Sequence, residues 1–125
     1  MSYRKDLVAK LTATPGIQTK VQGRYFFGEA PIEEPYPLIV FFSYTGRPVS
    51  AKGSQAKTDD TTVQIEVISN DLDEVEQLSA ELLTALDRQS FGKCYHCLHL
   101  RTVDDFDTES KTYRIIQDYQ FWQRR

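Results

Sequence analysis

The segment Cys94–His99 comes closest to a metal site in residue types and spacing, with two cysteines and two histidines in six residues. Thiolate and imidazole ligands suit tetrahedral zinc, but no second Cys-x-x-Cys pair or distant histidine pair completes the set. The segment also has the composition of a strand, in which Cys94 and Cys97 would point to opposite faces, as would His96 and His99. We therefore expect buried, reduced cysteines and edge histidines, with a structural metal as the weaker alternative.

A second candidate is the acidic run over residues 104–109, which places four carboxylates in six residues. Oxygen-rich loops bind calcium or magnesium, but this run lacks the glycine and the twelve-residue spacing of an EF-hand loop. The sequence predicts a solvated acidic turn over Asp104–Ser110. A divalent-ion site and a contact surface for a basic neighbour, formed by Asp104, Asp105 and Asp107, are the alternatives.

A third candidate is the polar stretch at about residues 46–60, which predicts a long loop. It contains Arg47, Lys52 and Lys57, and no acidic residue occurs before Asp59. It has no interleaved aromatic residues on which nucleic-acid bases could stack. Long loops inside a compact domain are usually functional or disordered. We expect an arm that is mobile in the free subunit and ordered in the assembly, where it could meet the acidic run. A flexible solvated loop and a nucleic-acid contact through Lys52 and Lys57 are the alternatives.

Catalytic motifs are missing from the sequence. There is no Gly-x-Ser-x-Gly, and the 6 glycines form no phosphate-binding loop. The two histidines lie three residues apart, away from any serine or cysteine in a nucleophile context. We therefore expect no enzyme, no catalytic residue and no cofactor.

Length and composition predict one soluble domain over residues 1–125. The net charge of -3 and the pI of about 5.3 argue against specific nucleic-acid binding, which favours a basic domain. The longest apolar run, Leu38–Phe42, is far short of the roughly 20 residues of a membrane helix. No signal-peptide pattern follows Met1, so we expect a cytoplasmic site of synthesis and no membrane partner.

Hydrophobic periodicity predicts an α+β fold. We expect a mainly antiparallel sheet with two helices packed on one face, in the order α-β-β-β-α-β-β. The run Leu38–Tyr44 is apolar without alternation, which indicates a strand covered on both faces or one whose outer face meets a partner. Val63, Ile65 and Val67 should share one core with the apolar helix stripe, which includes Val75, Leu78, Leu82 and Leu86. The expected helices span residues 3–13 and 72–88, and the expected strands 21–27, 38–44, 61–69, 94–103 and 112–122.

Charge is distributed unevenly along the chain. Residues 1–62 contain 8 basic and 6 acidic residues, whereas residues 63–125 contain 7 basic and 12 acidic residues. Such asymmetry fits head-to-tail self-association, in which one end of a subunit meets the opposite end of its neighbour.

The whole chain resembles the small tail-completion proteins of long-tailed bacteriophages. No single motif is diagnostic, and the order and spacing of several short ones carry the resemblance. They are Val21-Gln22-Gly23-Arg24-Tyr25, Ala30-Pro31, Pro35-Tyr36-Pro37-Leu38-Ile39-Val40, Gln64-Ile65-Glu66-Val67 before the helix Asp73–Leu86, and Asp107 with Tyr113–Trp122. The cysteine-histidine cluster does not belong to this pattern.

The resemblance implies a virion protein that forms a ring of six subunits at the head-proximal end of the tail. Such a ring, assembled in the bacterial host cytoplasm, would stop polymerisation of the tail tube and join it to the head connector. Its partners would be itself, the tail tube protein and the connector or stopper protein, with DNA passing through the ring. The alternatives are another head–tail connector ring protein, such as a stopper, and a cellular metal-binding or enzymatic domain.

Overall fold

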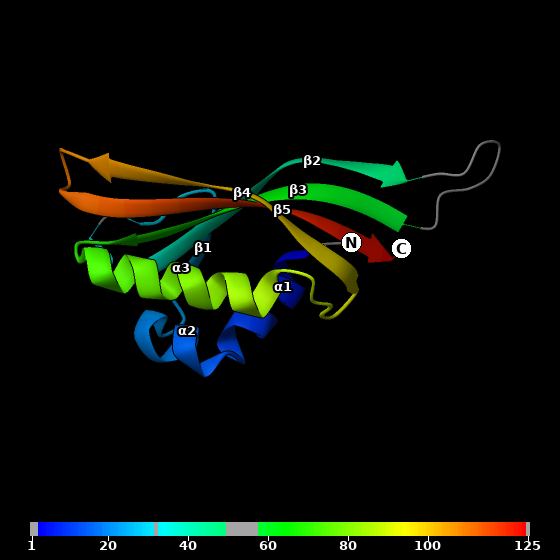
Figure 1. Cartoon of the computed structure of the whole chain (residues 1–125), viewed down its shortest axis with the longest axis horizontal. Coiled ribbons are helices and arrows are strands. Elements are labelled where there is room, and N and C mark those ends of the chain that lie inside the picture. The colour runs from blue at the N-terminus through cyan, green and yellow to red at the C-terminus, as the bar shows by residue number, and fades with distance from the viewer. Residues whose placement is uncertain (1–2, 32, 50–57, 125) are drawn as a thin grey trace.

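The computed structural model describes residues 3–31, 33–49 and 58–124. Five strands form one sheet in the order β1-β2-β3-β5-β4, in which only β1 and β2 are parallel. Figure 1 shows the helices on one side of this sheet. The expected α+β class and the mainly antiparallel sheet are confirmed. The elements are α1 (Tyr3–Thr12), α2 (Pro15–Val21), β1 (Tyr25–Phe27), β2 (Leu38–Val49), β3 (Thr58–Ser69), α3 (Leu72–Leu86), β4 (Cys94–Asp107) and β5 (Thr112–Arg124).

Helix α2 is an element that the sequence interpretation missed. Pro15 does not simply end the first helix; it occupies the first turn of the second, where its missing N–H has no helical partner to lose. Ile17 and Val21, four residues apart, are both buried in the core. The chain leaves α2 through Gln22 in the left-handed conformation, so the expected strand over residues 21–27 shrinks to β1.

The β2–β3 hairpin is longer than expected. The ladder continues through Arg47↔Asp60 to Val49↔Thr58, so both ends of the predicted loop at 46–60 are strand. This polar part of β2 lacks the apolar alternation that marks a half-buried strand, which is why the sequence pattern missed it. The expectation of mobility concerns chiefly residues 50–57, which lie outside the described residues.

The first four residues of the apolar run in β2, Leu38–Phe41, are covered on both faces as expected, whereas Tyr44 at its end is 49% exposed. Ile39 and Phe41 belong to the main core between the sheet and the helices. Leu38 and Val40 point the other way into a small second cluster with Ile68. Alternate residues of one strand therefore serve two different clusters, which explains why its apolarity is continuous.

The acidic run is also strand rather than turn. Asp104 and Asp105 pair with Ile115 and Arg114 in the β4–β5 ladder, and the turn lies over residues 108–111. The start of β5 pairs with β3 on one side and with this part of β4 on the other. The predicted acidic turn over Asp104–Ser110 is therefore wrong in its first half.

Helix α3 makes the central contact of the fold. The Asp71 side chain caps it by accepting hydrogen bonds from the backbone N–H groups of Asp73 (3.0 Å) and Glu74 (3.4 Å). Its apolar stripe packs with inward-facing residues of the sheet in one core, as the sequence predicted, except that Val75 is buried outside this cluster. That core includes Leu78, Leu82, Leu86, Val63, Ile65 and Val67. No helix in the described part of the chain could span a membrane.

Shortening the α3 stripe at its centre tests this packing. Leu82 is fully buried, so we expect Leu82→Ala to lower the free energy of unfolding by about 2–5 kcal/mol. Leu72→Ala on the same helix is the matched control, because Leu72 is 44% exposed. Urea unfolding of both variants measures the difference. Equal effects of the two substitutions would contradict the packing described here.

Candidate functional site

Both cysteines of the metal-like cluster lie in the main core. An irregularity in the β4–β5 register between Cys94 and His96 shifts the alternation, so Cys94 and Cys97 face the same way. The expectation that they point to opposite faces is therefore wrong, because it assumed an unbroken strand. His96 lies against Trp122 and His99 against Tyr119, on opposite faces as predicted.

The thiols are in an environment that opposes ionisation. Burial is the main cause that raises the pKa of Cys94, to about 11, and burial also raises the pKa of Cys97. Within residues 3–31, 33–49 and 58–124, no three His, Cys, Asp or Glu side chains converge as metal ligands would. Zinc requires thiolates, and these protonated sulfurs pack as small apolar groups.

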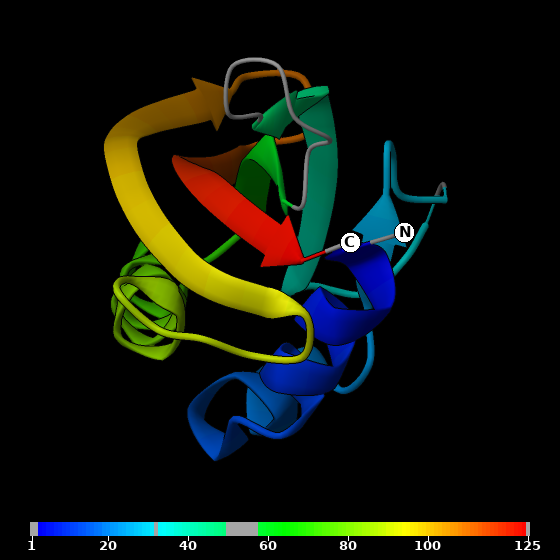
Figure 2. The ribbon, with the colours of Figure 1, turned by 90° about the vertical axis from the view of Figure 1, so that its right-hand side faces the viewer.

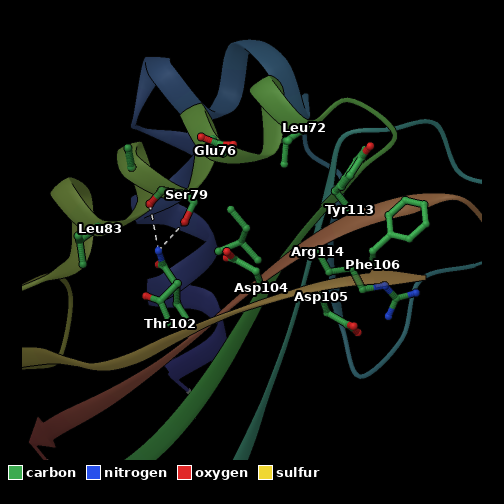
Figure 3. Close-up of a pocket in the computed structure, with 13 residues that line it drawn as sticks. Leu72, Glu76, Ser79, Leu83, Thr102, Asp104, Asp105, Phe106, Tyr113 and Arg114 are labelled. Carbon is green, nitrogen blue, oxygen red and sulfur yellow. Dashed lines mark hydrogen bonds between the residues drawn. The ribbon is translucent and has the colours of Figure 1, made fainter. Parts of the chain in front are cut away.

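The acidic residues of β4 diverge instead of forming a cage. Asp104 and Asp105 are consecutive strand residues, and Figure 3 shows Asp104 on the groove side of β4 and Asp105 on the other side. Asp107 accepts a hydrogen bond from the Glu109 N–H (3.0 Å), which is the main cause of its lowered pKa. It also pairs with Arg114 at 3.3 Å. This geometry assigns Asp107 to the hairpin turn and leaves Asp104 and Asp105 exposed.

A groove of about 780 Å³ lies between α3, the second half of β4 and the first half of β5. Figure 3 shows helix residues on one wall and strand residues on the other. The strands here extend beyond the cover that α3 provides, so Phe106 is 44% exposed. Three acidic residues, Glu76, Asp104 and Asp105, contribute to its lining beside apolar side chains. The residues that define the groove best are Leu72, Glu76, Leu83, Asp104, Phe106 and Tyr113.

Arg47 lies at the other end of the sheet from this groove. Through the ladders, Arg47 is in one row with Asp60, Trp122 and His96, whereas Asp105 is in the row of Ile68 and Arg114. The two rows are eight residues apart along β3, which corresponds to about 26 Å. Figure 1 shows the outer end of the β2–β3 hairpin and the β4–β5 turn at opposite ends of the molecule.

The structure therefore does not bring the predicted basic and acidic residues together within one subunit. In the backbone register Arg47 lies opposite Asp60, and Lys52 and Lys57 lie outside the described residues. The sequence interpretation missed the groove completely, because the groove depends on where α3 stops covering the sheet. The groove has only a weak signal in the sequence. Its residues Asp104 and Phe106 are separated by Asp105 and follow Val103, so no regular alternation of polar and apolar residues marks them.

The buried thiols give a direct test of the metal interpretation. We expect Cys94 and Cys97 to react slowly with a thiol reagent at pH 8, because their raised pKa values keep them protonated and burial blocks access. Both should react at once in urea. Metal analysis of the purified protein should find no stoichiometric zinc. One zinc per chain, or fast native labelling, would contradict this assignment.

Comparison with known proteins places the chain in a family. The chain matches the family model of tail completion protein gp17 over residues 5–124. A comparison with curated proteins finds no match. Among solved structures, a chain from the virion of a native gene transfer agent particle has a TM-score of 0.72 at 12% identity, covering 98% of this chain and 94% of that one. Bacteriophage SPP1 gp17 has a TM-score of 0.58 at 20% identity, covering 94% and 86%.

These two likenesses show a shared fold, and the family match extends over nearly the whole length. The position of that match, from the first turn of α1 to the end of β5, includes every element described above. The chain therefore belongs to the tail completion protein gp17 family, a family of structural proteins of bacteriophage tails.

Proposed function

We propose that this protein forms a closed ring of six subunits at the head-proximal end of the phage tail. The ring ends polymerisation of the tail tube and presents a surface to the head connector. The family match supports a tail completion role, and the likeness to a virion chain supports the same architecture. The role requires no catalysis and no cofactor, and DNA would pass through the ring opening.

The observation that carries this proposal is the separation of charge along one sheet. Asp104 and Asp105 are exposed at one end, and the segment that carries Lys52 and Lys57 follows β2 at the other. A subunit with opposite charges at opposite ends satisfies both by contacting two neighbours in the same sense. Such heterologous contacts generate a ring when the rotation closes.

Mass measurement of the assembled protein tests the ring, and a complementation assay tests its place. We expect native mass spectrometry to find a closed oligomer of six chains. Tails made without the protein should vary in length and fail to join heads, and supplying the protein should correct both defects. Normal tail length and head joining without the protein would refute the terminating role. Normal tail length combined with failed joining would favour a stopper-like connector role.

Reversing the acidic charges tests the contact between subunits. We expect Asp104→Lys with Asp105→Lys to weaken assembly, because each exposed pair contributes about 0–1 kcal/mol and the loss is repeated at every contact. Unfolding of the free subunit should change by less than about 0.5 kcal/mol, as for other surface substitutions. Raising the salt concentration should weaken the wild-type ring in the same direction.

The matched control changes the same charge elsewhere. Glu29→Lys with Glu33→Lys alters two other exposed carboxylates by the same amount, and assembly should be unaffected. Asp107 stays unchanged in both variants, because it caps the turn and pairs with Arg114. If assembly is unchanged by both the charge reversal and high salt, Asp104 and Asp105 do not lie in the interface between subunits. Destabilisation of the free subunit by a chelator would instead indicate a divalent-ion site.

A further inference from the structure

Strand β4 is the edge of the sheet, and the chain itself closes only the first half of that edge. Cys94 exchanges two backbone hydrogen bonds with Phe91, each 2.9 Å. Further along, the Cys97 carbonyl accepts from the Arg88 N–H (2.7 Å), and the His99 N–H donates to the Asp87 carboxylate (2.9 Å). The connection between α3 and β4 thus pairs with both backbone groups of Cys94, with the Cys97 carbonyl and with the His99 N–H.

The second half of the edge is open. His99 is opposite Tyr119, and its N–H points away from β5. In an antiparallel ladder, pairs whose backbone groups bond to each other alternate with pairs whose groups point outward, and His99–Tyr119 is a pair of the second kind. The next outward residues of β4 are those opposite every second residue of β5. They are Thr102, Asp104 and Phe106, opposite Gln117, Ile115 and Tyr113. No described segment pairs with them there. Their N–H and C=O groups form a template for one more strand.

The opposite edge of the sheet consists of the short strand β1 and of the part of β2 beyond it, and that part of β2 is protected. Beyond Phe41, where the pairing with β1 ends, β2 contains a register irregularity between Ser43 and Thr45. The same alternation directs Pro48 outward, and proline has no N–H to offer a neighbouring strand. Bulges and prolines are the features that prevent pairing at natural sheet edges. Continuation of the sheet from β4 of one copy to β2 of the next is therefore disfavoured.

Charge decides which strand the open edge can accept. Pairing of β4 with a second β4 would bring Asp104, Asp105 and Asp107 of both copies together, and like charges in adjacent strands are destabilising. The segment Ser50–Lys57 contains two lysines and no acidic residue or proline. It cannot reach the open edge of its own subunit. Along β3, Thr58 lies 7 to 11 residues from the rows of Thr102, Asp104 and Phe106, which corresponds to about 23–36 Å, whereas eight residues held at both ends reach at most about 13 Å.

We propose that the open half of β4, at Thr102, Asp104 and Phe106, receives the segment Ser50–Lys57 of a second copy as an added strand. The inference deepens the proposed function and rests on it, since it identifies the backbone contact that joins neighbours in the ring. The added strand lies along the open side of the groove beside Phe106. Lys52 and Lys57 lie near Asp104 and Asp105, so main-chain pairing supplies the contact and charge supplies its direction.

A proline substitution separates this contact from folding. Thr102→Pro removes an outward N–H and leaves the ladder to β5 intact, so the free subunit should unfold as the wild type does. We expect its subunit affinity to fall about tenfold or more, through lost hydrogen bonds and steric exclusion of the added strand. Thr102→Val, which keeps the N–H, should assemble normally. Val103→Pro, whose N–H faces β5, should destabilise the free subunit.

Two further measurements keep the test decisive if Thr102→Pro does not fold. In the wild type, the amides of Thr102, Asp104 and Phe106 should exchange with deuterium rapidly in the free subunit and slowly in the ring. Lys52→Glu with Lys57→Glu should weaken assembly, and combining it with Asp104→Lys and Asp105→Lys should restore it. Restoration identifies the occupant of the edge.

The outcomes distinguish this inference from the proposed function. Rings that form equally well with Thr102→Pro, or amides that exchange equally in both states, overturn the strand pairing and leave the ring intact. Slow exchange in the ring without restoration by the charge swap overturns the assignment of Ser50–Lys57. Failure of the wild type to assemble at all overturns both proposals.

Discussion

The packing of α3 against the inner faces of β3 and β5 is the contact on which the rest of the structure depends. The helix has fifteen residues and a length of about 22 Å, whereas β4 has fourteen residues and extends over about 46 Å. A helix of this length cannot cover such a strand. The uncovered remainder of β4 bends away at the edge of the curved sheet (Figure 2), and the groove follows from that mismatch.

A buried polar network fixes how α3 sits on the sheet. Gln117 of β5 donates hydrogen bonds to the Ser79 carbonyl (3.2 Å) and hydroxyl (2.7 Å), shown as dashed lines in Figure 3. The Tyr119 hydroxyl donates to the Gln117 side-chain carbonyl. Sliding α3 by one turn would leave these buried groups without partners, at a cost of about 1–3 kcal/mol for each. The leucine stripe alone is less selective, because apolar contact has no direction.

The sequence was most informative where burial and periodicity coincide. Leu78, Leu82 and Leu86 define α3 because they recur at helical spacing, and Val63, Ile65 and Val67 define β3 through alternation. These patterns predicted the class of the fold and its core. Each of these patterns is regular because one face of the whole helix or strand packs against the same core.

The misses occur where tertiary contacts override local preference. Helix α2 is too short for a strong pattern, and Pro15 was interpreted as a stop although it also suits a helix start. Asp104 and Asp105 are poor strand formers, and the neighbouring β5 holds them extended. The shift between Cys94 and His96 is invisible to any argument that assumes an unbroken period of two. The candidate surface depends on these same features, so only the structure could reveal it.

The protection of β2 has a consequence for how the protein behaves when it is concentrated before assembly. A cross-β fibril grows because each added chain presents a fresh edge equivalent to the one it has just covered. Here a chain that docked on the open edge of β4 would present the three-residue strand β1 and the bulged, proline-containing part of β2 to the next one. Stacking of native subunits edge to edge therefore stops after one step, which favours a supply of soluble subunits over fibrous aggregates.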